Sequence, residues 1–332
     1  MKQFFISFFI FSAGIAVLVS LMFLSVSGGS SDIPFSVVRS ALLHFDPTDM
    51  RHLVVADLRL PRVVASALVG AALSVAGAVM QGTTGNPLAD SGLLGLNAGA
   101  GFAVALCFAF FPAAGYVYIV FASFAGAAAG AFLVNFVASM RRGGATHMRI
   151  VLAGAAVTAL LAALSQGIAL YFNVAQDIMF WTVGGVAGVG WRQVAVLAPC
   201  ILAALLTSML FSRSITVLSF GEEVAKGLGL NVSFVRLVSF VCVTVLAGAS
   251  VAVVGAVGFV GLIFPHLAKF ITGADYRRII PVSAILGAVM MVLADFASRT
   301  LNPPAETPVG AFAALIGVPF FLYLSRRQKR AT

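Results

Sequence analysis

The chain has 332 residues, of which 61% are hydrophobic and only 9% are charged, whereas soluble domains carry roughly 25% charged residues. Its mean hydropathy is +1.07. No soluble fold needs so little polar surface, so the composition indicates a helical protein that crosses a membrane many times. The net charge of +9 would fit a nucleic-acid partner. However, the basic residues lie between hydrophobic runs, as in the inner loops of membrane proteins, and we expect no nucleic-acid binding.

Ten apolar runs have the composition and approximate length of membrane-spanning helices, and polar or Pro- and Gly-rich breaks separate them. In chain order, the predicted helices cover residues 4–26, 62–81, 92–111, 117–140, 149–171, 193–212, 234–254, 256–272, 280–298 and 309–324. No linker marks a second domain. We therefore expect a single domain over residues 1–332 with an all-α polytopic membrane fold of about ten transmembrane helices.

The positions of Lys and Arg predict the orientation of these helices. With the N-terminus in the cytoplasm, fourteen of the twenty Lys and Arg residues fall on the inner side and six on the outer side. An even number of spans with both termini cytoplasmic fits this asymmetry. The long outer connection, residues 27–61, contains "IPFSVVRSALLHF", which predicts a short surface helix.

Several kinds of chemistry are missing from the sequence. None of the four lysines is followed by Ser or Thr, so the chain has no GxxxxGK[ST] loop for ATP phosphates, and it has no HExxH metal motif. The three cysteines lie in apolar runs without a CxxC pair, which favours packing over metal binding. We therefore expect no catalytic residue, no metal site and no cofactor. An intramembrane enzyme would need a nucleophile or metal constellation that this sequence lacks.

Asp295 is the clearest ionisable residue within a predicted span, and Arg299 follows it on the same helical face. Proton-driven transporters carry acids or histidines in the middle of the membrane, and Asp295 is the only serious candidate here. A structural ion pair and a functional site are both open for this residue. An ion-coupled secondary transporter is the weaker alternative, because the sequence offers no relay of ionisable residues.

Residues 219–230, "SFGEEVAKGLGL", form a charged island between apolar runs. Each charge would cost roughly 2.5–3.5 kcal/mol at the bilayer centre, so the segment is expected in the cytoplasm. Ser219 and Glu222 have the spacing of a capping box. Glu222 and Lys226 have that of an ion pair, and Gly229 suits the end of a helix. A helix of two turns is unstable alone in water, so it either docks into a partner or is an ordinary capped loop.

Residues 80–101, "MQGTTGNPLADSGLLGLNAGAG", connect the second and third predicted helices. Asn86 and Pro87 initiate a turn, and the glycines let neighbouring helices approach closely. A turn near membrane depth needs its backbone groups satisfied by protein or water. This fits a constriction of a pathway at its cytoplasmic end, although a close-packed helix hairpin explains the same residues equally well.

Several stretches together resemble the FecCD permease family of ABC importers for ferric siderophores, haem and cobalamin. They are "LRLPRVVASALVGAALSVAGAVMQGTTGNPLADSGLLGLNAGAG", "GEEVAKGLGL", "GFVGLIFPHLAKF", "ADYRRIIPVSAILGAVMMVLADFASR" and "ETPVGAFAALIGVPFFLYL". The resemblance covers about residues 33–327. It implies the type II importer architecture, in which two permeases, a second copy or a homologous chain, surround one pathway. It also implies ATP hydrolysis on separate ABC ATPase subunits and delivery by an extracytoplasmic substrate-binding protein.

The resemblance implies roles for particular residues. The cytoplasmic loop at residues 213–236 is expected to enter a groove on the ATPase, and its coupling residues are Gly221, Glu222, Glu223, Ala225, Leu228 and Gly229. The cytoplasmic gate is expected at Asn86, Pro87 and Leu88. Family arginines pair with glutamates of the binding protein on the outer face, and the matching residues are Arg59, Arg62 and Arg299. Interfacial anchoring is the alternative interpretation of "RLPR".

The expected substrate is a ferric siderophore. Wide amphipathic chelates suit a large pathway lined by small, weakly polar residues, and no cluster of His or Met indicates a bare metal ion. The outer stretch and the C-terminal "ETP…IGVPFFLYL" look closest to ferric-siderophore members of the family, with haem and cobalamin as alternatives. We expect transport by alternating access, without covalent chemistry in this chain.

Overall fold

The computed structural model describes residues 2–29, 33–140, 147–183, 185–301 and 306–328, and every regular element among them is a helix. The longer helices are α1 (Lys2–Ser27), α4 (Leu60–Thr84), α5 (Leu96–Phe110), α6 (Tyr116–Ser139), α7 (His147–Tyr171), α9 (Trp191–Leu210), α12 (Val232–Val254), α13 (Val260–Thr272), α14 (Tyr276–Thr300) and α15 (Val309–Gln328). The shorter elements are α2 (Phe35–Leu43), α3 (Met50–Leu53), the π-helical turn η1 (Val54–Arg59), the 3-10 turn η2 (Ser91–Leu94), α8 (Ala175–Val183), α10 (Ser212–Leu218) and α11 (Glu222–Gly227).

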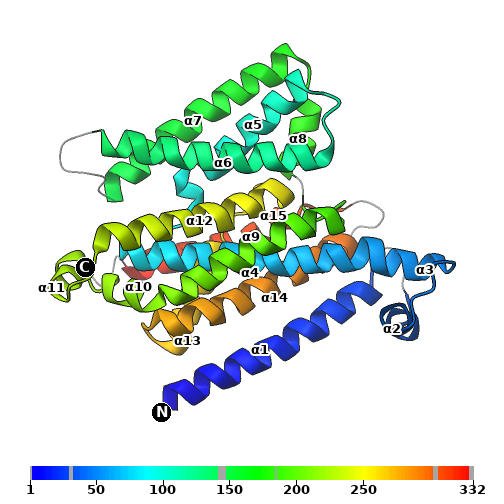
Figure 1. Cartoon of the computed structure of the whole chain (residues 1–332), viewed down its shortest axis with the longest axis horizontal. Coiled ribbons are helices and arrows are strands. Elements are labelled where there is room, and N and C mark those ends of the chain that lie inside the picture. The colour runs from blue at the N-terminus through cyan, green and yellow to red at the C-terminus, as the bar shows by residue number, and fades with distance from the viewer. Residues whose placement is uncertain (1, 30–32, 141–146, 184, 302–305, 329–332) are drawn as a thin grey trace.

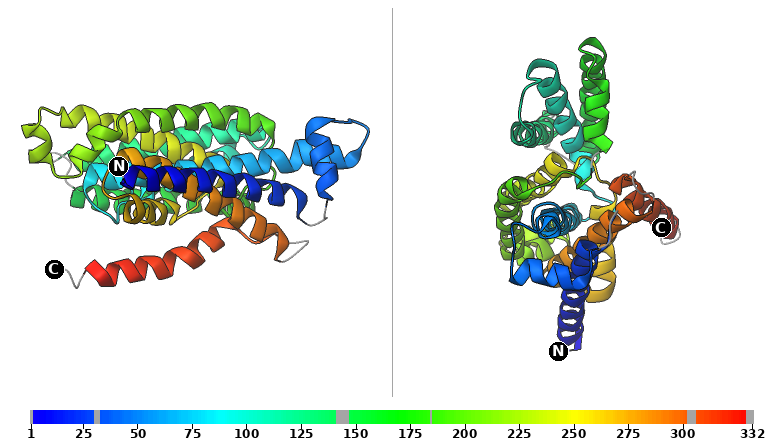
Figure 2. Two further views of the ribbon diagram at one scale, coloured as in Figure 1. Left: turned by 90° about the horizontal axis from the view of Figure 1, so that it is seen from below. Right: turned by 90° about the vertical axis from the view of Figure 1, so that its right-hand side faces the viewer.

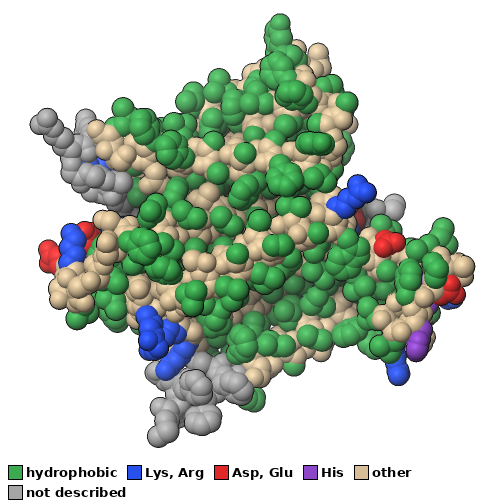
Figure 3. Space-filling model, in the orientation of Figure 1, with side chains coloured by type: hydrophobic (Ala, Val, Ile, Leu, Met, Phe, Trp, Pro, Cys, Tyr) green, Lys and Arg blue, Asp and Glu red, His purple; other side chains and the backbone are tan. Residues whose placement is uncertain are grey.

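Within the described residues, seven helices are long and apolar enough to cross a membrane, and α5, α13 and α15 are shorter apolar helices. Each of these ten helices overlaps one predicted range, so the expected all-α polytopic fold is confirmed. Hydrophobic side chains cover the flanks of the molecule, whereas charged side chains gather at its two ends (Figure 3). A bilayer requires this distribution, because a charged side chain in the hydrocarbon is costly.

Helix α4 lies in the middle of the bundle, in contact with α14, α12, α13 and α9 (Figure 1). Helices α5, α6 and α7 form a second layer, which α5 and α6 attach to α12. Helix α1 packs along α14 on the opposite side. The first residues of α1 and the last of α15 point toward the end that carries α11, whereas α2 and α3 lie at the other end (Figure 2). Following the predicted orientation, we name these the inner end and the outer end.

Backbones approach closely along α4, because the contact positions are glycines. A Cβ atom on Gly77 would overlap the backbone of Gly261 in α13, and one on Gly70 would overlap the backbone of Gly287 in α14. Lipid tails are as apolar as leucine, so close packing, rather than the hydrophobic effect, holds helices together inside a bilayer. The glycines of α4 therefore determine how near its neighbours lie.

Helix α13 begins at Val260, later than the predicted residue 256. The preceding glycine-rich segment is not helical, and Gly255 and Phe259 have left-handed backbone angles, with φ of 76° and 69°. Such angles interrupt a right-handed helix. Consequently, α13 occupies only part of the membrane depth that a full span would cover.

The second predicted span begins earlier than residue 62. The helix runs from Met50 through η1 into α4, and within η1 the amide of Leu60 donates to the carbonyl of Val55, five residues back. Pro61 has no N–H, and its ring would crowd the carbonyl four residues earlier in a regular α-helix, so a widened turn accommodates it. Helix α2 confirms the predicted surface helix, whereas α8 was not predicted.

The contact at Gly77 provides a test of this packing. We expect Gly77→Ala to destabilise the protein by about 1–3 kcal/mol, because its methyl group forces two backbones apart. Gly101→Ala in α5 is the matched control, since no atom lies within 4 Å of the added Cβ. The melting temperatures of the purified proteins in detergent check this prediction. Equal values for the two variants would contradict the close approach.

Candidate functional site

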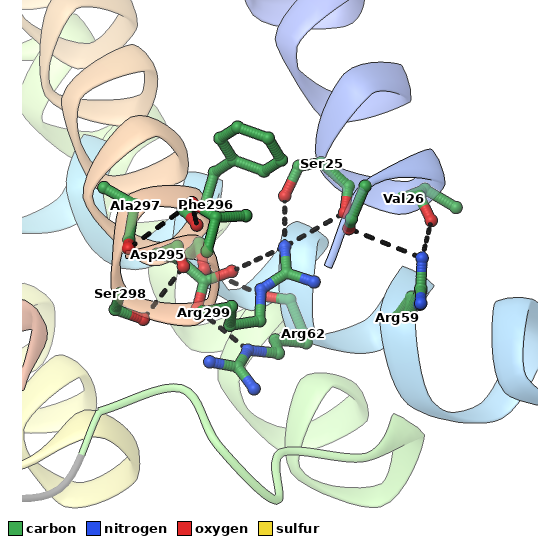
Figure 4. Close-up of polar contacts among 12 residues, drawn as sticks. Ser25, Val26, Arg59, Arg62, Asp295, Phe296, Ala297, Ser298 and Arg299 are labelled. Atoms are coloured by element: carbon green, nitrogen blue, oxygen red, sulfur yellow. Dashed lines mark hydrogen bonds and ion pairs between the residues drawn. The ribbon is translucent and has the colours of Figure 1, made fainter. Parts of the chain in front are cut away.

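At the outer end, the side chain of Arg62 binds two acids at once. Its Nε donates to Oδ1 of Asp295 at 2.8 Å (Figure 4). Its Nη1 and Nη2 donate to the two carboxylate oxygens of Glu306 at 2.8 and 2.9 Å. Bidentate pairs of this kind fix geometry as well as charge. Arg62 therefore ties α4 to α14 and to the segment that enters α15.

Arg299 and Arg59 reach the C-terminal end of α1 (Figure 4). Nη2 of Arg299 donates to the carbonyl and hydroxyl oxygens of Ser25 at 3.0 and 2.6 Å and lies 3.3 Å from Oδ2 of Asp295. Nη1 of Arg59 donates to the carbonyl of Val26 at 2.7 Å. The last carbonyls of a helix lack intrahelical donors and carry negative partial charge, so both arginines stabilise this helix end.

The ion pairs that Asp295 makes with Arg62 and Arg299 are buried. The side chain of Asp295 is 0% exposed, that of Arg299 is 7% exposed and that of Arg62 is 12% exposed. Buried charges are stable only when they are paired. The predicted pair of Asp295 and Arg299 is confirmed, and Arg62 joins it from 233 residues away in the sequence. These contacts favour the ion-pair interpretation of Asp295 over an ion-coupling role.

The three arginines border a pocket of about 370 Å³ at the outer end, together with the acids Asp57 and Glu306. The hydrogen bonds from Arg62 hold the pKa of the Glu306 carboxyl below its usual value, so Glu306 is charged at neutral pH. Docking of a partner at Arg59, Arg62 and Arg299 stays a prediction. All three side chains line the pocket, and each is already bonded within the molecule.

At the inner end, Glu222 of α11 accepts from Lys226 and Arg236, with both nitrogen–oxygen distances at 2.7 Å. These bonds hold the pKa of the Glu222 carboxyl below its usual value, and the bond from Lys226 has the larger effect. The predicted pair of Glu222 and Lys226 is therefore confirmed. Arg236 belongs to α12, so Glu222 also connects α11 to a long helix of the bundle. The neighbouring Glu223 is exposed.

The predicted capping box at the start of α11 is wrong. The hydroxyl of Ser219 donates instead to the carbonyl of Thr216 at 2.7 Å, at the end of α10. Helix α11 begins after Gly221, whose φ of 118° no other residue type adopts readily. The carboxylate of Glu222 is engaged with its two cationic partners. Ser219 therefore caps the C-terminal end of α10 instead of the N-terminal end of α11.

The C-terminal end of α11 has the Schellman pattern of hydrogen bonds. The amide of Gly229, with φ of 78°, donates to the carbonyl of Lys226 at 2.9 Å, and the amide of Leu230 donates to the carbonyl of Ala225 at 3.0 Å. Ala225 is fully buried in a cluster with Leu218. The predicted helix end at Gly229 is confirmed, and the buried Ala225 packs α11 against the bundle.

The larger apolar side chains around α11 point away from the molecule. Leu228 is 70% exposed, Val224 is 49% exposed, and Phe220, which precedes the helix, is 64% exposed. Helix α11 lies at the inner end of the molecule (Figure 1), and these side chains form a protruding surface there together with its charged residues. Exposed apolar groups outside a bilayer and rimmed by charge are typical of a protein–protein contact.

The predicted gate residues form a turn that follows α4. Oδ1 of Asn86 accepts from the amide of Leu88 at 2.9 Å, and its backbone carbonyl accepts from Ala89 at 3.1 Å. This is an Asx turn, which the Asn-Pro dipeptide favours. Asn86, Pro87 and Leu88 are partly buried. Their role as a gate stays a prediction.

A buried glutamine next to this turn was missed in the sequence. Nε2 of Gln81 donates to the carbonyls of Gly261 and Leu262 at 3.3 and 3.2 Å. Pro265 has no N–H, so the carbonyl of Gly261 lacks its usual helical donor, and inside a membrane another group must replace it. Gln81 thus binds α4 to the interrupted helix α13 where the two backbones touch.

The described residues also bear on metal chemistry. Among them, no group of three or more His, Cys, Asp and Glu side chains is placed to hold a metal ion. The cysteines Cys107, Cys200 and Cys242 are free and lie apart on α5, α9 and α12.

The buried pairs at the outer end predict the effect of losing one charge. Asp295→Asn keeps the shape of the side chain but leaves Arg62 and Arg299 without their shared counter-ion. Breaking a buried pair in this way costs about 3 kcal/mol, and we expect a clearly lower melting temperature in detergent. Asp49→Asn is the control, because its pair with Arg51 is exposed and Asn also caps a helix well. A shift as small as that of the control would contradict the structural role.

Comparisons with known proteins cover almost the whole chain. The model of the FecCD transport family matches residues 17–327. The iron(3+)-hydroxamate import system permease protein FhuB of Bacillus subtilis (strain 168) is 49% identical over 318 residues, which are 96% of this chain and 83% of FhuB. The Fe(3+) dicitrate transport system permease protein FecC of Escherichia coli (strain K12) is 38% identical over 325 residues, 95% of this chain and 96% of FecC.

The fold comparison agrees with the sequence comparison. A solved metal-chelate type ABC transporter in an inward-facing conformation superposes with a TM-score of 0.84 at 26% identity, and the match covers 96% of this chain and 99% of that one. Sequence, fold and the distribution of charge place this multi-span protein in the cell membrane. The chain belongs to the FecCD transport family, whose members are the non-catalytic membrane permease subunits of ABC importers.

Proposed function

We propose that this permease carries a ferric siderophore across the cell membrane by alternating access, driven by a separate ATPase. The observation that carries the proposal is the 49% identity to FhuB, a permease named for iron(3+)-hydroxamate. FecC, at 38% identity, is named for Fe(3+) dicitrate. Both names describe ferric iron held by an organic chelator. Such a chelate brings its own iron ligands, so the pathway needs only shape and weak polar contacts.

The proposed contact with the ATPase is the protruding surface at the inner end. The exposed side chains of Val224 and Leu228 offer an apolar anchor, and Glu222 and Glu223 supply charge beside it. The Schellman end and the buried Ala225 hold α11 rigidly enough to transmit force. The sequence contains no GxxxxGK[ST] loop for ATP phosphates, which agrees with ATP hydrolysis on a separate subunit.

Helix α4 is the proposed connection between the two ends. It has 25 residues, a length of about 37 Å, and it joins Arg62 at the outer end to the turn at Asn86. A push on α11 reaches α12 through Glu222 and Arg236, and α12 packs on α4. Movement of these helices would open or close the Asn86–Leu88 turn, as proposed for the gate.

On the outer face, we propose that a substrate-binding protein docks its acidic residues at Arg59, Arg62 and Arg299. A second copy of the permease, or a homologous chain, completes the pathway. Arginines suit this contact because their guanidinium groups bind carboxylates in a fixed orientation. The pocket that all three line gives a partner side chain room to reach them.

The function is tested by reconstitution of the permease into proteoliposomes. The ATPase faces the lumen, and a binding protein loaded with the chelate is added outside. We expect ATP-dependent uptake of radioactive iron supplied as a ferric siderophore. Ferric citrate, haem and cobalamin are the competing substrates. Uptake that persists with an inactive ATPase would contradict the mechanism, and preferential uptake of haem or cobalamin would contradict the substrate.

Leu228 tests the proposed contact with the ATPase. We expect Leu228→Glu to weaken ATPase association at least about tenfold, equivalent to about 1.4 kcal/mol, because it places a charge in an apolar contact. Met50→Glu at the outer end is the matched control, since Met50 is 74% exposed and Leu228 is 70% exposed. Co-purification with the ATPase and its affinity for the permease measure the effect. Unchanged association of a folded Leu228→Glu permease would rule out this surface.

A further inference from the structure

One of the carboxylates that line the pocket at the outer end, Glu306, already binds an arginine of the permease itself. Glu306 occupies both Nη groups of Arg62, at 2.8 and 2.9 Å, while Asp295 occupies the Nε at 2.8 Å. Glu306 is 42% exposed, whereas Asp295 is 0% exposed. The two acids therefore differ in kind: Asp295 is fully buried, whereas Glu306 lines the pocket together with Arg62.

The edge of Arg62 that Glu306 holds is one that an incoming carboxylate would need. A guanidinium binds carboxylates bidentately through parallel N–H groups, and on Arg62 the two Nη groups already hold Glu306. The cluster of Arg62, Arg299, Asp295 and Glu306 is also neutral as it stands. A partner acid that approached it without displacing anything would add an unbalanced negative charge.

We infer that Glu306 is an internal competitor for docking: it occupies the place on Arg62 that a carboxylate of the binding protein takes in the complex. Docking then exchanges one carboxylate for another, and the buried charge stays balanced at every stage. Asp295 remains on Nε throughout, so α4 and α14 stay joined during the exchange. The inference rests on the proposed function, because it assumes that a binding protein docks at this pocket.

Release of Glu306 would affect the segment that leads into α15. The residue after Glu306, Thr307, donates its amide to the carbonyl of Ser298 in α14 at 3.1 Å, and α15 begins shortly afterwards at the buried Val309. Release of Glu306 breaks a contact between α4 and the chain entering α15 and leaves the contact with α14 in place. Docking would therefore release the segment that enters α15 from α4 at the outer end.

A purely structural role for Glu306 predicts the opposite effect on affinity. If Glu306 served only to orient Arg62, its loss would weaken docking. If it competes, its loss strengthens docking, because the binding-competent fraction of the permease rises and apparent affinity rises in proportion. Occupancy of Arg62 by Glu306 for about nine-tenths of the time corresponds to about a tenfold change. The sign of the effect separates the two roles.

The test compares Glu306→Gln with the unmodified permease in the complete complex with its ATPase, embedded in lipid nanodiscs. The dissociation constant of the binding protein that supports uptake is measured at fixed salt. We expect binding about tenfold tighter in Glu306→Gln. Asp49→Asn is the control: it removes the same charge from the outer end, on an acid paired with Arg51, and it should leave the constant unchanged within about twofold.

The same measurement in a permease that lacks Arg62 shows whether the effect of Glu306→Gln depends on Arg62. In an Arg62→Ala permease, Glu306→Gln should no longer tighten binding, because the contested side chain is gone. Unchanged or weaker binding by a Glu306→Gln complex that melts as a folded protein overturns the exchange. A tightening that survives in the Arg62→Ala background overturns it as well. If the unmodified complex fails to bind any binding protein, the proposed function itself is wrong and the exchange falls with it.

Discussion

Contact between bare backbones along α4 is the constraint on which the rest of this molecule depends. Inside a bilayer the hydrophobic effect does not drive helices together, so the bundle needs surfaces that fit at van der Waals distance. Gly70 and Gly77 provide such surfaces toward α14 and α13. Because α4 is thereby enclosed by its neighbours, it can act as the rigid element that links the ion pairs at one end with the Asn86 turn at the other.

The outer end shows how a membrane protein keeps arginines near the hydrocarbon. The three arginines of the pocket are each matched within the fold: Arg59 by the carbonyls at the end of α1, and Arg62 and Arg299 by the shared Asp295. Internal pairing makes the isolated permease stable. The same pairing occupies these arginines from within, so a carboxylate that docked here as proposed would have to compete with Glu306 for Arg62.

The inner end follows the opposite rule. Helix α11 is too short to be stable alone, and it is held by a Schellman end, by Ala225 and by the bonds from Glu222 to Lys226 and Arg236. Its larger apolar side chains remain exposed, and this exposure does not stabilise the isolated chain. Arginines paired within the fold at the outer end and exposed apolar side chains at the inner end therefore suit the two different contacts that we propose for these ends.

Sequence by itself determined the class of fold, the approximate helices, the placement of Asp295 and Arg299 on one helical face and the end of α11, because hydrophobic run length, i,i+4 spacing and glycine at a helix end are local properties. Only the tertiary structure decided which residues meet across the bundle. Arg62 reaches Asp295 and Glu306 over 233 and 244 residues of chain, and no spacing rule covers such distances. Ser219 shows the same limit at short range: its spacing fitted a cap for α11, but a neighbouring helix end lay closer. Local sequence patterns indicate which partners a side chain can bind, and tertiary packing determines which of them lies within reach.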